Sequence, residues 1–360
     1  MFSAQCLAPI TPMPTPYEST LAGDEFASAL AADMDSEHEV SQIEAPTRLV
    51  DYLKARLIAV PGREVGTLIT SGFVRIRHNG NDTTGRTYDL LTPGDRIGVA
   101  SPALAALKTS GRWITPWSTT LRVHHEDEDL LVVEKAAGVH VHPLGAHRAA
   151  TLLGALIFHA GARTNRPWGG WRPHIVQRLD RPTAGLLLVA KGPMMKDALV
   201  RLQQRGGLRR RYRAMVLGNV REAAGIIDDP LGRDPCCDYR RGRLSTECGG
   251  QSAVTCWSVV QRFEDRTLLD IEPLSGRTHQ IRAHLAGIGH SIVGDRLYSS
   301  RYSTAAEGTD DAARMRQESS LPGQAASTAI ALRAVELAFR HPRSDEQLSF
   351  RSPPTAEFGR

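Results

Sequence analysis

Apolar residues first recur at helical spacing near residue 47. Leu49, Leu53 and Leu57 are four residues apart, which places them on one face of a helix. A second helical stretch follows at residues 64–71, and Gly72 ends it. The pattern therefore predicts a pair of short helices in this part of the chain.

Strand patterns follow the helix pair. Residues 73–76 alternate as a short strand, and residues 91–99 place a Pro-Gly-Asp turn before another. The sequence thus predicts a small α/β domain over residues 47–99. Taken together, the helix pair, the small sheet and the Pro-Gly-Asp turn near its end resemble the alpha-L RNA-binding module. A small α/β domain without an RNA role is the alternative.

From residue 121 onward, strand signals dominate. The all-apolar run at residues 186–190 suits a buried central strand. Further strands are expected at residues 129–135, 214–218, 268–271 and 335–339. Helices are expected at residues 149–159, 194–204 and 279–287. This mixture predicts an α+β domain with a mixed, largely antiparallel sheet over residues 121–360.

Three segments lack such patterns. Residues 1–46 are acidic and offer too little apolar area to offset the entropy of ordering, so we expect a disordered tail. Residues 100–120 are interpreted as a linker between domains. Residues 299–328 are rich in small, polar and charged side chains, and we expect an exposed, flexible insertion.

Charge is distributed unevenly along the chain. The net charge is +5, but residues 1–45 contain eight acidic residues and no Lys or Arg. The remainder has 44 basic and 31 acidic residues, a net charge of +13. A basic body favours a polyanionic partner, because contacts to phosphate release counterions. Many basic proteins bind no polyanion, so charge alone does not decide the function.

Composition argues against several classes of protein. No apolar run approaches the roughly 18 residues of a membrane span, and the start lacks the pattern of a secretory signal. The five cysteines have neither zinc-site spacing nor the regularity of a disulfide framework. We therefore expect a cytoplasmic protein with reduced thiols, no metal and no membrane partner.

The first candidate for chemistry is Asp180, in a loop that leads into the apolar run at residues 186–190. Arg178 and Arg181 flank this carboxylate. Nearby guanidinium groups keep a carboxylate ionised, which suits a nucleophile or an electrostatic stabiliser. A structural ion pair that anchors the loop is an equally good interpretation of this segment.

The second candidate is Tyr212, which four arginines surround within residues 208–216. Such a segment suits phosphate contacts beside an aromatic ring on which a base stacks. A solvated strand edge is the alternative interpretation.

The third candidate is Arg282, in a helix expected to begin near Thr278. Arg282 would lie beside apolar neighbours, and a buried arginine needs a carboxylate partner. Nearby histidines lack an acidic residue at ligand spacing, so we expect no metal here. They are His279, His284 and His290.

Together these segments resemble the RluA-type pseudouridine synthases, which isomerise uridine within RNA. Six motifs follow the order of that family between residues 121 and 355. They are Leu-Leu-Val-Val-Glu-Lys-Ala-Ala-Gly-Val-His-Val-His-Pro at 130–143, the Asp180 and Tyr212 segments, Gly-Gln-Ser-Ala-Val-Thr at 250–255, Gly-Arg-Thr-His-Gln-Ile-Arg-Ala-His at 276–284, and Leu-Ala-Phe-Arg-His-Pro at 337–342. The resemblance implies a catalytic domain of the pseudouridine synthase type, an RNA substrate, and no cofactor or metal.

The resemblance also implies roles for single residues. Asp180 matches the catalytic aspartate, Tyr212 the tyrosine that packs against the base, and Arg282 the arginine that pairs with the aspartate. Arg178 matches an arginine beside the flipped nucleotide. Further substrate contacts are expected from Arg181, Arg211, Arg277, His279 and Gln280.

Two positions depart from the family pattern. Gln177 and Arg333 each stand where histidine is more usual, and we expect them to affect substrate choice more than chemistry. Family members with an alpha-L module mostly modify large-subunit (23S) ribosomal RNA, so this is the expected substrate, with transfer RNA as the alternative. A non-catalytic RNA-binding protein of the same fold, and a hydrolase with an Arg-flanked aspartate, remain competing hypotheses.

Overall fold

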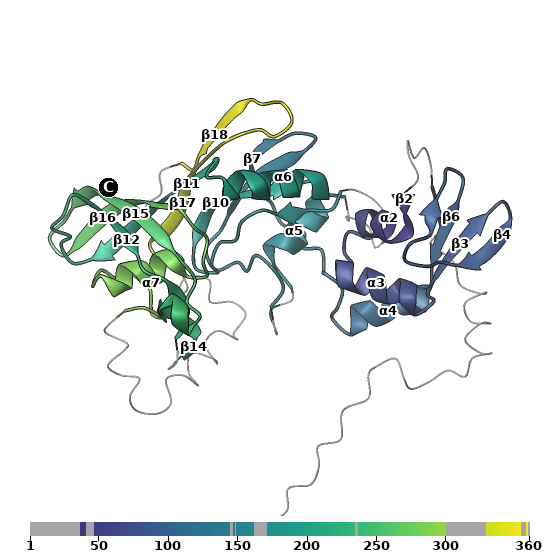
Figure 1. Cartoon of the computed structure of the whole chain (residues 1–360), viewed down its shortest axis with the longest axis horizontal. Coiled ribbons are helices and arrows are strands. Elements are labelled where there is room, and N and C mark those ends of the chain that lie inside the picture. Colours follow the sequence, from purple (N-terminus) through teal and green to yellow (C-terminus); the bar gives the residue numbers. More distant parts are fainter. Residues whose placement is uncertain are drawn as a thin grey trace, which may run out of the picture. The chain divides into compact units, whose positions relative to one another are not determined.

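The computed structural model describes residues 37–40, 47–144, 147, 149–161, 171–234, 237–299, 329–353 and 358. The chain divides into two compact units (Figure 1). The first contains Met1–Asp51 and Arg63–Ser110, and the second contains Tyr52–Gly62 and Gly111–Arg360. Among the helices of the described residues, none combines the length and apolar character needed to cross a membrane.

The first unit is a small antiparallel sheet with helices. The sheet has the strand order β1–β6–β3–β4, and β2 pairs separately with β5. The strands are β1 (Glu37–Glu39), β2 (Thr47–Arg48), β3 (Val74–His78), β4 (Asn81–Thr84), β5 (Leu90–Leu91) and β6 (Arg96–Val99). The helices are α2 (Leu49–Arg56), whose second half belongs to the other unit, α3 (Gly62–Thr70) and α4 (Ser101–Thr109).

Two segments of this unit differ from the expectations. Glu37–Glu39 lie within the expected tail, yet they pair with β6, and Val40 behind them is fully buried. The expected linker contains α4, which buries Leu104 and Leu107 on one face. Both segments therefore belong to the folded unit, because each contributes apolar residues or backbone pairing to it.

The second unit is built on one large mixed sheet. Its strand order is β12–β15–β16–β11–β17–β10–β8–β7, with β18 beside β17 and β9 beside β10. The strands are β7 (Arg122–Glu126), β8 (Leu130–Lys135), β9 (His174–Ile175), β10 (Ala184–Ala190), β11 (Leu208–Leu217), β12 (Ala224–Asp228), β15 (Val254–Arg262), β16 (Arg266–Pro273), β17 (Leu332–Arg340) and β18 (Gln347–Arg351). Among these pairings, only β10 with β17 is parallel.

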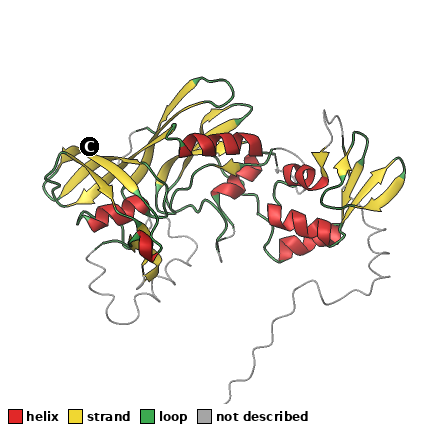
Figure 2. Cartoon of the chain, viewed as in Figure 1, coloured by secondary structure: helices red, strands yellow, loops and turns green. Residues whose placement is uncertain are grey.

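Helices and a separate hairpin complete this unit, and Figure 2 shows how much strand outweighs helix in it. The remaining elements are α5 (Leu152–His159), α6 (Pro193–Gln204), α7 (Gln280–Gly287), the 3-10 turn η1 (Thr246–Cys248), and the hairpin of β13 (Leu231–Asp234) and β14 (Cys237–Arg243).

The centre of the sheet is buried on both faces. Leu187 of β10 packs in a core that includes Leu285 of α7, whereas Leu188 packs in a second core that includes Leu199 of α6. Neighbouring residues of a strand point to opposite faces. Helices on both faces thus explain why β10 is apolar throughout.

Gly185 allows β10 and β17 to run side by side. Its φ is +118°, and a Cβ atom at this position would lie 2.2 Å from the carbonyl oxygen of Ala334. A larger residue would both strain the backbone and displace β17. Since Gly185 follows the loop that carries Asp180, this contact fixes where that loop enters the sheet.

The predicted α+β fold with a mixed, largely antiparallel sheet is confirmed. Each strand and helix expected after residue 121 is present, with ends shifted by a few residues. Most of the expected tail and, apart from Ser299, the expected insertion at 299–328 lie outside the described residues.

Candidate active site

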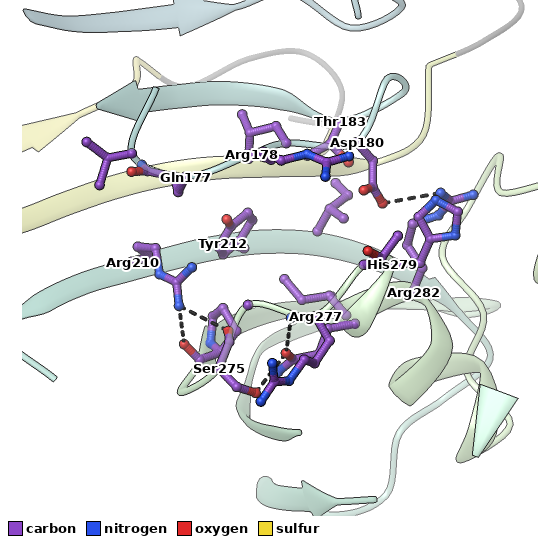
Figure 3. A pocket seen from close by; sticks show the side chains of 18 of the residues that line it. Gln177, Arg178, Asp180, Thr183, Arg210, Tyr212, Ser275, Arg277, His279 and Arg282 are labelled. Atoms are coloured by element: carbon purple, nitrogen blue, oxygen red, sulfur yellow. Dashed lines mark hydrogen bonds and ion pairs between the residues drawn. The ribbon is translucent and has the colours of Figure 1, made fainter. Parts of the chain in front are cut away.

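One cavity on the α7 face of the sheet gathers most of the predicted site residues (Figure 3). Its volume is about 310 Å³. The walls come from the loop before β10, from β11, from the loop after β16, and from the start of α7. Asp180, Tyr212 and Arg282, which are far apart in sequence, all line it.

Asp180 and Arg282 form an ion pair at one end of this cavity. Nη1 of Arg282 lies 3.2 Å from Oδ2 of Asp180. The arginine side chain is 6% exposed and the aspartate side chain 23%. The carboxylate is therefore open to the cavity while its counter-charge is buried, and the buried arginine has the partner that its burial requires.

Arg282 also binds a second carboxylate, that of Asp295. Its Nε and Nη2 donate to the two oxygens of Asp295 at 2.7 and 2.9 Å. The ring of Tyr298 lies against the same guanidinium, with 5.0 Å between Cζ and the ring centroid. Sequence reasoning assigned no role to Asp295 or Tyr298.

Tyr212 projects from β11 into the cavity. Burial raises the pKa of its phenol, while the charge of Arg210 opposes that rise. The phenol is therefore protonated at neutral pH and offers a flat apolar face. Beside it, Nη2 of Arg210 donates to the carbonyl oxygens of Pro273 and Ser275 at 3.2 and 3.0 Å, which holds the loop after β16 in place.

Four of the six predicted substrate contacts line the same cavity: Arg178, Arg277, His279 and Gln280. Arg178 is exposed on the wall next to Asp180. Gln280 is buried, and its Oε1 accepts the backbone N–H of Arg277 at 3.0 Å. Gln280 thus shapes the wall from within, whereas Arg178 is accessible to a ligand.

The other two predicted contacts, Arg181 and Arg211, are not among the lining residues. Nε of Arg181 donates to the carbonyl oxygen of Gly138 at 3.1 Å. Nη1 of Arg211 lies 3.6 Å from Oε2 of Glu336. Side chains alternate along β11, so Arg211 points away from the face that carries Tyr212.

Comparison with known proteins identifies the family of this chain. Residues 129–287 match the family described as RNA pseudouridylate synthase. An uncharacterized RNA pseudouridine synthase of Synechocystis is 33% identical over 312 residues, which cover 86% of both chains. The chain belongs to the RNA pseudouridine synthase family. The prediction made from its six motifs is confirmed.

Two further similarities accompany this assignment. The synthase is 34% identical to ribosomal large subunit pseudouridine synthase D of Vibrio cholerae, over 69% of this chain and 72% of that one. Human RNA pseudouridylate synthase domain containing 4 is 22% identical, with a TM-score of 0.49 over 66% of this chain and 90% of that one.

Lys135 is a buried lysine beside the synthase site, and the sequence analysis assigned it no role. Its side chain ends β8, and the residue is 1% exposed. Nζ donates to the carbonyl oxygens of Ala136 and Val139 at 2.9 Å and of Arg181 at 3.1 Å. Because Arg181 directly follows Asp180, Lys135 ties the loop of the predicted nucleophile to the sheet.

The two departures from the family pattern occupy different places. Gln177 lines the cavity and is 6% exposed, and its Oε1 has no hydrogen-bond partner among the described residues. Arg333 is buried outside the cavity, where its Nη2 donates to Oε1 of Glu134 at 2.9 Å. Only Gln177 is therefore placed to affect a bound substrate directly.

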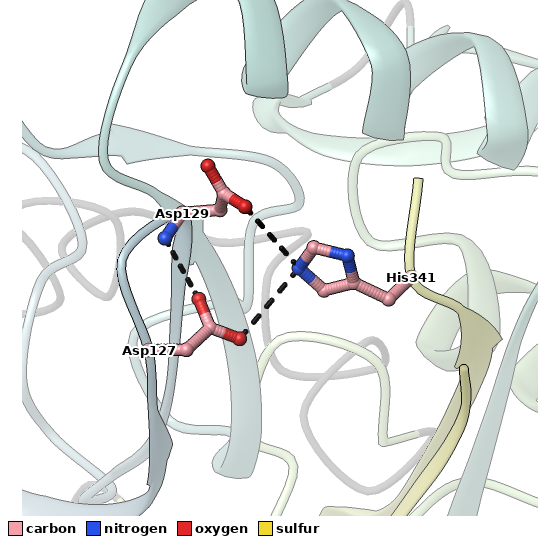
Figure 4. A group of neighbouring side chains, drawn as sticks. All are labelled: Asp127, Asp129 and His341. Atoms are coloured by element: carbon pink, nitrogen blue, oxygen red, sulfur yellow. Dashed lines mark hydrogen bonds and ion pairs between the residues drawn. The ribbon is translucent and has the colours of Figure 1, made fainter. Parts of the chain in front are cut away.

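A group of acidic and histidine side chains lies between the β7–β8 and β17–β18 turns (Figure 4). Nε2 of His341 lies 3.6 Å from Asp127 and 3.7 Å from Asp129. Its Nδ1 accepts the backbone N–H groups of Arg343 and Ser344, both at 3.1 Å, so the ring proton resides on Nε2. A metal would need the lone pair of Nε2, and the group therefore fits an ion-pair cluster better than a metal site.

Proposed function

We propose that this synthase isomerises uridines in large-subunit ribosomal RNA and that Asp180 is its nucleophile. The observation that carries this assignment is the accessible carboxylate of Asp180, paired with buried Arg282 at the cavity wall. The name of the Vibrio cholerae relative refers to the large ribosomal subunit, which favours this RNA over transfer RNA.

In the proposed reaction, Asp180 attacks the target nucleoside at the uracil ring or at the anomeric carbon of the ribose. The bond from C1′ to N1 breaks, the uracil turns, a bond from C1′ to C5 forms, and the bond to Asp180 breaks, which frees the carboxylate. C5 loses a proton and N1 gains one, so the atoms balance without a co-reactant. Because Tyr212 is protonated at rest, we assign it packing against the base rather than the role of a resting base.

Access to the cavity requires that the uridine leave its base stack. Enzymes that act on a base within paired RNA extrude it into a pocket and read it there by stacking and hydrogen bonding. Tyr212 offers the stacking face, and exposed Arg178 is placed to fill the space that the base vacates. Arg178 and Arg277 also supply positive charge for the neighbouring phosphates.

Asp180→Asn tests the nucleophile, because the amide keeps the shape of the side chain but cannot form the covalent bond. We expect product formation on unmodified large-subunit ribosomal RNA to fall at least ~1000-fold, in line with the loss of a nucleophile. Asp197→Asn, on the exposed side of α6, is the matched control and should retain activity. The measurement is pseudouridine mapping with a single-turnover rate, run in parallel on transfer RNA.

Product formed equally by Asp180→Asn and wild type would remove Asp180 as the nucleophile. No product from the wild-type protein on either RNA would instead favour a non-catalytic RNA-binding protein. Faster turnover on transfer RNA than on ribosomal RNA would reassign the substrate and leave the nucleophile in place.

We further propose that the first unit contributes to RNA binding. Its exposed arginines include Arg48, Arg63 and Arg86, and such side chains contact phosphates without reading sequence. We also propose that the synthase acts in the cytoplasm, on the expectation that its substrate is ribosomal RNA.

A further inference from the structure

The segment after α7 carries two residues whose contacts converge on Arg282. Asp295 is 2% exposed and Tyr298 8% exposed, and the described contacts of both lead toward the Asp180 pair. We propose that Asp295 and Tyr298 are positioning residues that set the reactivity of Asp180 through Arg282. This inference rests on the proposed role of Asp180 as the nucleophile.

Asp295 fixes the orientation of Arg282. Asp295 accepts Nε at 2.7 Å and Nη2 at 2.9 Å, a bidentate pair that fixes the plane of the Arg282 guanidinium. The Nη1 edge then remains for Asp180, at 3.2 Å. Two carboxylates thus share one arginine. The buried carboxylate of Asp295 sets the orientation in which Arg282 contacts the accessible carboxylate of Asp180.

Tyr298 supports the guanidinium of Arg282 from its flat side. The Tyr298 hydroxyl accepts the backbone N–H of Arg241 on β14 at 2.8 Å and lies 3.1 Å from Nδ1 of His279. Burial raises the pKa of this phenol to about 12, so the ring stays neutral. Tyr298 therefore joins Arg282 to β14 and to the residue before α7.

Asp295 also influences Asp180 through charge. The carboxylate of Asp295 offsets the charge of Arg282 that Asp180 faces, and this buried pair is poorly screened by solvent. Without that neutralisation, the guanidinium would hold Asp180 more tightly and make its carboxylate a weaker nucleophile. The charged and titratable groups that face Asp180 from the packed elements are Lys135, Tyr212, His279, Arg282 and Tyr298.

A purely structural ion pair is the competing explanation, and two variants separate it from positioning. Asp295→Asn keeps the shape but leaves the charge of Arg282 to Asp180 alone. We expect the single-turnover rate to fall at least ~10-fold, the dissociation constant for RNA to change less than ~2-fold, and the acid limb of the pH–rate profile to move to lower pH. Tyr298→Phe keeps the ring and removes its anchor, and we expect a smaller loss of rate with the acid limb unchanged.

Asp270→Asn is the matched control, since Asp270 makes a bidentate pair with Arg213 outside the cavity, at 2.8 and 3.3 Å. It should lower the melting temperature without moving the acid limb. All rates are measured below the melting temperature of each variant.

An unshifted acid limb and unchanged rate in Asp295→Asn would overturn the inference while leaving Asp180→Asn inactive and the proposed function intact. If Asp295→Asn does not fold, Asp295→Glu tests the geometric part instead: it keeps the charge but displaces the bidentate pair with Arg282, so a wild-type rate in that variant would overturn the inference. Full activity in Tyr298→Phe would overturn the role of Tyr298. Activity in Asp180→Asn would instead refute the nucleophile itself, whatever Asp295 does.

Discussion

At the scale of single residues, Lys135 links burial to the position of the proposed nucleophile. Burial lowers the pKa of its ammonium group to about 7, while the charge of Asp180 opposes that shift. An unfolded lysine titrates near ~10.4. Between these two values the unfolded chain binds one proton more than the folded chain, so the cost of burying the charge is full below pH 7 and is lost as pH rises.

Lys135→Met should therefore destabilise the protein in a pH-dependent way. At pH 7 we expect a loss of about 2 kcal/mol in the free energy of unfolding, because three buried carbonyl groups lose their donor. The loss should grow by about 2 kcal/mol at pH 9, since only the wild type gains stability over this range. Urea unfolding at both pH values measures it, with exposed Lys54→Met as the control. A difference that shrinks as pH rises would contradict the sign of the shift.

The role of a residue was predictable where its own chemistry required a specific interaction partner. A buried Arg282 required a carboxylate, and Asp180 provides one. Arg211 was grouped with Tyr212 by proximity in sequence, although alternation along a strand separates them. Asp295 was not predictable as the second partner of Arg282, because its pairing arises from folding of the chain after α7 and leaves no periodic signal.

At the scale of elements, the sequence pattern predicted those helices and strands whose burial follows from their own apolar residues. The prediction of β10 is correct because its apolar run is buried on both faces. The prediction of α6 is correct because Met195, Leu199 and Leu202 pack on one side of the helix. By contrast, β12 was not predicted, because its burial and its pairing with β15 depend on the rest of the sheet. The segment of α4 was interpreted as a linker because its apolar face is too short to give a clear helical pattern.

Gly185→Ala should disrupt the parallel contact between β10 and β17. The added methyl group would overlap the backbone of Ala334, and the φ of +118° is unfavourable for alanine. We expect a loss of about 3 kcal/mol or more in unfolding free energy, together with reduced turnover because the Asp180 loop enters β10 here. Gly192→Ala is the control, since nothing lies within 4 Å of its added Cβ and its cost should stay below ~1 kcal/mol. Equal urea midpoints for the two variants would show that the strands can separate without cost.

At the scale of the whole molecule, the boundary between the units is not where the sequence suggested. The expected first domain was residues 47–99, yet Tyr52–Gly62 belongs with the second unit. Ile58 packs in one cluster with Ile157, and Nη2 of Arg172 donates to the carbonyl oxygens of Leu57 and Val60 at 2.7 and 2.5 Å. The catalytic unit is therefore discontinuous in sequence, which no local composition change marks.

This discontinuity predicts the result of truncating the chain. A protein of residues 111–360 loses the segment at 52–62, exposes Ile157 and leaves the guanidinium of Arg172 without these two acceptors. Compared with residues 37–360, we expect its melting temperature to fall by roughly 5–10 °C. Ile58→Ala in the longer protein should reproduce part of that loss without removing the first unit. Affinity for ribosomal RNA, measured well below both melting temperatures, should fall in the truncated protein but not in Ile58→Ala, since only the truncation removes the arginines of the first unit. Equal melting temperatures would mean that residues 52–62 do not stabilise the catalytic unit, and equal affinities would mean that the first unit does not bind this RNA.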